Sequence, residues 1–91
     1  MTRSIADERR PATGAASLFL VRHALGVTRA DLSGRTGIPA TALSLFEEGW
    51  VDLWEDDKLD VARVLGVPAT VLWGPSLGVL AAWLERPQAT A

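Results

Sequence analysis

The sequence predicts an all-α fold, a compact bundle of five helices followed by an extra apolar helix at the C-terminal end. Apolar residues recur at intervals of three and four, which is the period of a helix, and no segment shows the alternation of a strand. Glycines follow the apolar segments and are typical helix stops. The chain has 91 residues, of which 48% are hydrophobic. That length and composition indicate one folded domain with a small core.

The first predicted helix follows a polar segment. Residues 1–14 have mixed charge and no apolar periodicity, so we expect them to form a flexible arm. From there the apolar side chains fall at helical spacing. This pattern predicts a helix over 15–25, which Gly26 ends.

Two short helices are predicted next. Thr28 and Asp31 approximate a capping box, in which each side chain accepts a hydrogen bond from an amide at a helix start. The second helix is therefore expected over 29–36, with Gly37 as its stop. A third helix is expected over 40–47, after a proline that suits a first-turn position.

Three further helices are predicted after an acidic stretch over 47–57, which is expected to be a loop of about eight residues or a loop that leads into a helix. Helical spacing indicates segments over 58–65 and 68–73, and Ser76 can cap a last helix over 77–84, whose side chains are apolar on almost every face. A tail over 88–91 follows. The side chains expected to fill the core are Leu32, Ile38, Leu43, Phe46, Leu65 and Leu72.

Charge and residue types exclude several classes of function. The formal net charge is −2, yet residues 47–60 hold seven acids against one lysine, while residues 18–46 hold three arginines against one acid. The absence of cysteine excludes disulfides, zinc ribbons and thiol nucleophiles. No apolar run reaches the ~18 residues of a membrane span, and no signal peptide is visible, so a cytoplasmic protein is expected.

An enzyme is the least favoured class. His23 is the only histidine, and no paired carboxylates or glycine-rich loop lie near it in the sequence. The acidic residues lack the ligand spacing of a calcium loop. Neither catalysis nor a cofactor or metal ion is expected.

Two short helices separated by a glycine-containing turn have the spacing of a helix-turn-helix unit. The residues that sharpen this signal are Leu32, Gly37, Ile38, Leu43, Ser44, Phe46, Glu47 and Gly49. At these positions the chain resembles the phage-repressor and Cro type of helix-turn-helix domain, the Xre-like family. The stretch Ala-Arg-Val-Leu-Gly-Val at 62–67 is similar to the signature at the end of that family's fourth helix. The resemblance covers about residues 17–74.

The resemblance implies a helix-turn-helix domain over 15–74 that binds double-stranded DNA as a transcriptional regulator. The residues that would face DNA are Arg29, Pro39, Ala40, Thr41, Ser44, Leu45 and Arg35. Of these, Ala40, Thr41, Ser44 and Leu45 occupy the base-reading positions, and Arg29 stands where the family has a phosphate-contacting glutamine. None of the base-reading residues makes bidentate contacts, so readout would be weak and biased toward A·T pairs. For the arginines, a solvated surface charge is the alternative.

A structural ion pair is also implied. Arg22 precedes Glu47 by 25 residues, which is similar to the family's pairing of its first helix with the end of its recognition helix. A half-buried bidentate pair of this kind would position the two helices. A phosphate contact by Arg22 is the alternative.

The departures from the family pattern favour a second hypothesis. Asp52 and Glu55 lie beside Trp50 and Trp54 where relatives often carry basic residues, so this acidic loop would repel DNA. Exposed tryptophans are common binding hot spots, which makes a protein-binding module on the same scaffold, such as an anti-repressor, antitoxin or docking domain, the alternative function. A third interpretation is that the two tryptophans fold back under the loop as a satellite core.

The C-terminal helix, within residues 75–87, bears on oligomeric state. Its apolar side chains cover more than one face, so it either packs on the bundle or pairs with a second copy. A homodimer would suit a DNA site with two halves. The candidate contact residues are Leu77, Leu80, Trp83 and Leu84.

Overall fold

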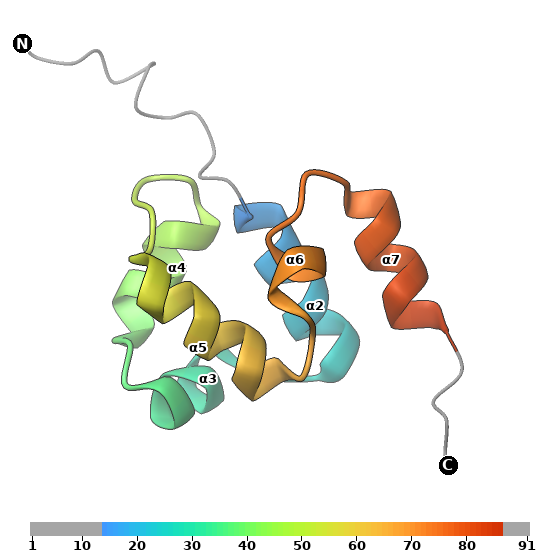
Figure 1. Cartoon of the computed structure of the whole chain (residues 1–91). Coiled ribbons are helices and arrows are strands. Elements are labelled where there is room, and N and C mark those ends of the chain that lie inside the picture. Colours follow the sequence, from blue (N-terminus) through green and yellow to red (C-terminus); the bar gives the residue numbers. More distant parts are fainter. Residues whose placement is uncertain (1–13, 87–91) are drawn as a thin grey trace, which may run out of the picture.

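The computed structural model describes residues 14–86, and over this range the chain forms a compact all-α globule without strands (Figure 1). The predicted tail, and all of the predicted arm except Gly14, lie outside the described residues. The helices are α2 (Ala15–Leu25), α3 (Arg29–Thr36), α4 (Ala40–Glu47), α5 (Glu55–Leu65), α6 (Ala69–Leu72) and α7 (Leu77–Glu85).

The first three helices have the predicted bounds. Gly26 and Gly37 end α2 and α3 in the left-handed conformation, with φ angles of 71° and 84°. Thr28 and Asp31 form the predicted capping box at the start of α3. These predictions are confirmed.

The last three helices differ from the prediction at their ends. α5 begins at Glu55, three residues before the predicted start, so part of the acidic stretch is helical. Three carboxylates occupy its first turn, where they interact favourably with the positive end of the helix dipole. α6 is shorter than predicted, and α7 extends to Glu85.

The core lies between all six helices and contains every side chain predicted for it. Its members are Leu18, Val21, Leu32, Ile38, Leu43, Phe46, Leu53, Val61, Ala62, Leu65, Val67, Leu72 and Leu80. Trp73 seals one side: its ring meets Phe46 edge-on at 5.9 Å between centroids, and its Nε1 donates a hydrogen bond of 2.9 Å to the Lys58 carbonyl.

The C-terminal helix packs on the bundle. α7 lies beside α2 and α6 (Figure 1), with Leu80 fully buried and Trp83 and Leu84 partly buried against the core. Ser76 caps it as predicted, because its Oγ accepts a hydrogen bond of 3.1 Å from the Val79 amide. Among the helices within residues 14–86, none is long and apolar enough to cross a membrane.

Candidate nucleic-acid interface

The helices α3 and α4 form one rigid unit. Leu32 from α3 and Leu43 from α4 are fully buried, and Ile38 in the connection is buried beneath them. Thr36 ties the turn together: its Oγ donates to the Leu32 carbonyl at 2.8 Å and accepts from the Ile38 amide at 3.1 Å. The position of α4 relative to α3 is therefore set by packing and by hydrogen bonds.

One face of α4 is left out of the core. Ala40, Thr41 and Leu45 are exposed, and Ser44 is half-buried on the same face. The Ser44 hydroxyl donates a hydrogen bond of 3.3 Å to Glu48 one turn later. Pro39 precedes α4 without a side-chain cap. The side chains on this face are small, apolar or hydroxylated.

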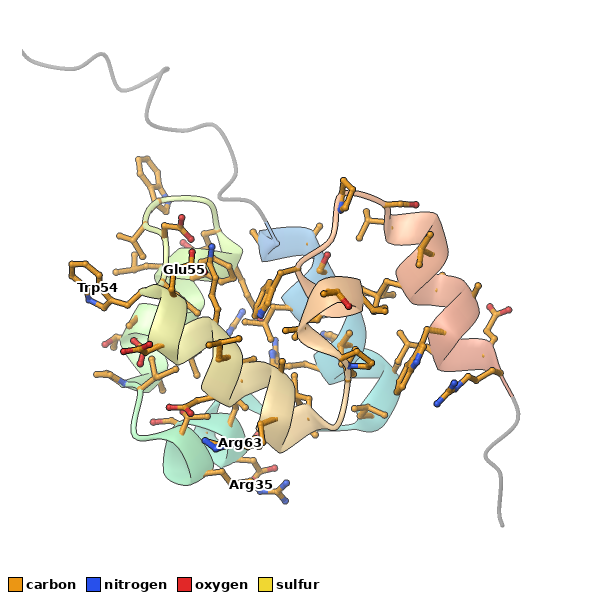
Figure 2. The ribbon with its side chains drawn as sticks, in the orientation of Figure 1. Arg35, Trp54, Glu55 and Arg63 are labelled. Carbon is orange, nitrogen blue, oxygen red and sulfur yellow. The ribbon has the colours of Figure 1, made fainter. Side chains whose placement is uncertain are left out.

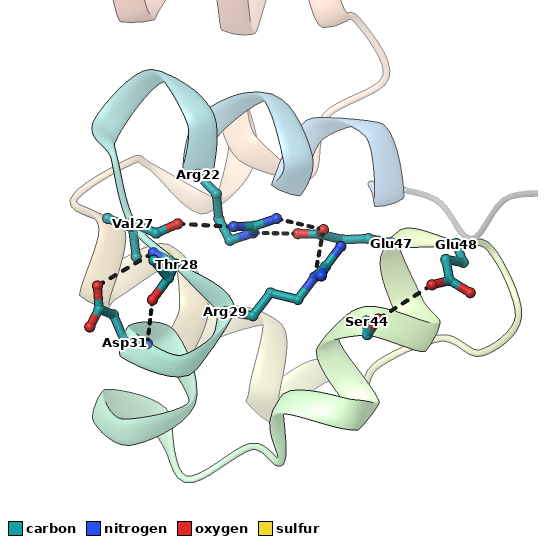
Figure 3. Close-up of polar contacts among 8 residues, drawn as sticks. All are labelled: Arg22, Val27, Thr28, Arg29, Asp31, Ser44, Glu47 and Glu48. Atoms are coloured by element: carbon teal, nitrogen blue, oxygen red, sulfur yellow. Dashed lines mark hydrogen bonds and ion pairs between the residues drawn. The ribbon is translucent and has the colours of Figure 1, made fainter.

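The end of α4 is held to α2 by a bidentate ion pair (Figure 3). Arg22 Nε lies 2.6 Å from Glu47 Oε2, and its Nη2 lies 2.9 Å from Oε1. The Arg22 Nη1 also donates to the Val27 carbonyl at 3.0 Å. The hydrogen bond to Glu47 raises the pKa of the Arg22 guanidinium, although partial burial lowers it. The pair predicted from the sequence is thus formed, and it is almost closed to solvent.

Glu47 also binds a second arginine, which the sequence analysis did not anticipate. Arg29 Nε lies 3.2 Å from Glu47 Oε1, so the carboxylate bridges α2, α3 and α4. The Arg29 side chain remains 40% exposed. Figure 3 shows it lying across the gap between the start of α3 and α4, toward Glu47.

An open hollow of about 490 Å³ lies next to this group, between the end of α2 and the start of α3. It is lined by the Arg22 and Arg29 side chains, by Thr28 and by His23, whose ring contacts Phe19 at 4.1 Å between centroids. All of its lining lies within residues 19–29, at the end of α2, in the connection and at the start of α3, and no motif in this stretch predicts a hollow. Arg35, by contrast, is exposed on the outer side of α3 and does not line it (Figure 2).

The acidic loop keeps its tryptophans outside. Trp54 is 82% exposed and Trp50 is 45% exposed, so the interpretation that they fold back under the loop as a satellite core is wrong. Leu53 is the loop residue that turns inward. Its smaller side chain fits beside the core, which leaves Trp54 at the start of α5 pointing away from the bundle (Figure 2).

Lys58 is a buried charge that the sequence analysis missed. It lies under the acidic loop, with its Nζ 3.1 Å from Asp52 and 3.8 Å from Glu55. Its ammonium also lies 5.9 Å from the centre of the Trp73 ring. Asp52 in the loop and Glu55 at the start of α5 therefore compensate a buried cation. The signal in the sequence that could have indicated this burial is a single lysine at the start of an apolar helical pattern.

The candidate dimer residues fall into two groups. Leu80, Trp83 and Leu84 are directed at the core of the same chain, whereas Leu77 is exposed. Val79, which was not among the candidates, is also exposed on α7.

Comparison with protein-family models, with curated proteins and with solved structures gives no match for this chain. Within the described range, no three histidine or acidic side chains lie together as metal ligands would.

Proposed function

We propose that the chain is a sequence-specific, DNA-binding transcriptional regulator of the helix-turn-helix type, similar to phage repressors, with α4 as its recognition helix. The observation that carries this proposal is the outer face of α4. The side chains of this face do not pack against the rest of the protein. The helix that carries them is held in place, because Glu47 pairs with Arg22 of α2 and with Arg29 of α3. In this class of protein the second helix of the unit enters the major groove, while the start of the first lies on the backbone.

The chemistry of this face supports a modest readout of sequence. Thr41 and Ser44 can form single hydrogen bonds with base edges, and Ala40, Leu45 and the Thr41 methyl can contact thymine methyl groups. No residue of this face can form a bidentate contact. Backbone contacts and DNA shape would therefore carry much of the affinity.

Arg29 is the strongest candidate for a phosphate contact. It interacts with Glu47 through its Nε, which leaves its two Nη groups for solvent or for a phosphate. Anchoring at one nitrogen restricts the side chain, so less conformational entropy would be lost on binding. Arg35 can add a second contact from the exposed side of α3.

The experiment that tests this function is fluorescence anisotropy with mixed-sequence duplex DNA at about 50 mM and about 200 mM salt. Binding should fall steeply with salt, and Arg29→Ala should reduce the slope of log K against log salt by about 1. Arg63→Ala is the matched control, because Arg63 is exposed on α5 and pairs with Asp60. The absence of binding at the lower salt would contradict the function, and an unchanged slope would remove Arg29 from the interface.

A homodimer through α7 is part of this proposal, since two recognition helices would match a site with two halves. The large exposed apolar side chains of α7 are Leu77 and Val79, and these would form the contact. Val79→Glu should convert a dimer into a monomer in light scattering at matched concentration. A wild-type chain that is already monomeric at ~100 µM would contradict the dimer.

A regulator of this kind would work in the cytoplasm.

A further inference from the structure

The exposed side chains at the start of α5 form a surface that the DNA-binding proposal does not use. Trp54 is 82% exposed and Leu59 is 56% exposed, and they are the two most exposed aromatic and aliphatic side chains of the loop and of α5. Asp52 and Glu55 line a hollow together with Trp54, Glu55 lines a second one together with Leu59, and Asp56 is exposed in the first turn of α5. We call these five residues the Trp54 surface.

The fold does not need a tryptophan at position 54. The side chain forms no capping hydrogen bond at the start of α5, where serine, threonine or aspartate would stabilise the helix. It also lies outside the core cluster and outside the layer of partly buried side chains around it. A large aromatic residue with neither role is typical of a binding hot spot.

The Trp54 surface is hollowed on both sides of Glu55. One hollow of about 380 Å³ is lined by Asp52, Leu53, Trp54 and Glu55. A second, of about 420 Å³, lies between α5 and α6 and is lined by Glu55, Lys58, Leu59, Ala69, Thr70 and Trp73. Because the hollows share Glu55, they are adjacent, one at the loop before α5 and the other between α5 and α6. Such a shape can accept the ridge of apolar side chains on one face of a helix.

The charge of the surface decides which occupant it fits. Lys58 is buried, and its Nζ lies close to Asp52 and Glu55, so it offsets part of their charge. Together with Asp56 and Asp57, the segment still has four carboxylates against one ammonium. Negative potential at the rim attracts a cationic partner and repels a polyanion.

The same charges argue against a second copy of the chain. A two-fold dimer through this surface would place each acidic rim against its own counterpart. We propose that the Trp54 surface binds a basic amphipathic helix of another protein, with one apolar side chain against Trp54, another against Leu59, and lysines or arginines on the carboxylates.

The test uses the full chain and a fluorescein-labelled synthetic peptide of 18 residues, with leucines on one helical face and lysines on the other. A second peptide carries glutamates in place of the lysines. Anisotropy should show binding of the lysine peptide at least tenfold tighter than that of the glutamate peptide. Trp54→Ala should weaken binding of the lysine peptide at least tenfold, and Asp56→Asn should weaken it two- to fivefold.

Leu25→Ala is the matched control, because it truncates an exposed apolar side chain at the end of α2 and should change the affinity less than twofold. Since Trp54 is exposed, its variant should keep the wild-type circular dichroism and urea midpoint. Equal binding of the two peptides, or unchanged binding by Trp54→Ala, would overturn the proposal.

Duplex DNA is measured on the same variants. If Trp54→Ala weakens DNA binding and spares peptide binding, the surface belongs to the DNA interface and the proposal is overturned. If the chain fails to bind DNA but binds the lysine peptide through Trp54, the docking proposal stands and the DNA-binding proposal fails.

Discussion

The substitution Arg22→Ala should be among the most destabilising changes to this fold. It removes two hydrogen bonds to Glu47, of 2.6 and 2.9 Å, and a third of 3.0 Å to the Val27 carbonyl. The Glu47 carboxylate, whose side chain is only 2% exposed, would keep a single contact of 3.2 Å from Arg29. A buried charge that loses its main partner cannot regain water without moving the helices apart.

The expected loss in the free energy of unfolding is about 3–5 kcal/mol, the range for breaking one side of a buried ion pair. The matched control is Arg29→Ala. Arg29 pairs with the same carboxylate but is 40% exposed, and Arg22 remains in place, so its loss should not exceed about 1 kcal/mol. Each variant removes one arginine that pairs with Glu47, so the two change the charge equally. They differ in the burial of the arginine that is removed, and a difference in stability therefore measures the effect of burial.

Urea unfolding followed by tryptophan fluorescence measures both losses, since Trp73 lies against the core. With an m-value of about 2 kcal/mol per M, a loss of about 4 kcal/mol lowers the midpoint by about 2 M, against about 0.5 M or less for the control. The combined variant Arg22→Met with Glu47→Leu should be more stable than Arg22→Ala, because no buried charge is left unpaired. Equal midpoints for Arg22→Ala and Arg29→Ala would refute the reasoning.

Three other predictions concern the fold, and thermal or urea unfolding measures each. Gly14→Ala should destabilise the protein strongly, because at its φ of 94° a Cβ would lie 2.4 Å from the Trp73 ring. Gly34→Ala in α3 is the control: its Cβ would meet nothing within 4 Å, and it should stabilise the protein by about 0.5–1 kcal/mol. If Gly34→Ala destabilised the protein more than Gly14→Ala, the packing described at Gly14 would be wrong. Thr28→Ala should cost about 1 kcal/mol through loss of the capping box, and an unchanged stability would mean that the cap contributes nothing. Leu80→Ala should cost about 2–5 kcal/mol, as for any fully buried leucine; a loss below about 1 kcal/mol would mean that α7 is not part of the core.

The sequence predicts the helices well because their signals are local. Apolar periodicity, the Thr28 and Asp31 capping box and glycine stops each act within a few residues, and all recur in the structure. The Arg22 and Glu47 pair is a long-range contact that was predicted through the family resemblance. Where local signals conflict, the prediction is less accurate. The acidic residues 55–57 suit both a loop and the first turn of a helix, and the helix dipole explains why they belong to α5.

Tertiary features of the candidate site could not be predicted from local patterns. Which loop residue turns inward depends on the space beneath the loop, and Leu53 occupies that space while Trp54 does not. The burial of Lys58 likewise depends on Asp52 and Trp73, which lie 6 and 15 residues away in the sequence. The contact between Arg29 and Glu47 requires that α2, α3 and α4 already be packed.

The two binding proposals respond in opposite directions to the charge at Asp56. This carboxylate is exposed in the first turn of α5, and an exposed charge acts on an approaching partner over about 8–10 Å at moderate salt. Asp56→Asn should therefore weaken a cationic peptide two- to fivefold and strengthen duplex DNA by a similar factor at about 50 mM salt, with both effects fading at about 200 mM. Glu85→Gln at the end of α7 is the matched control and should change neither affinity. If the affinities for the peptide and for DNA shifted in the same direction, a change in the fold of α5 would explain the result. The prediction that the Asp56 charge favours the peptide and disfavours DNA would then be wrong.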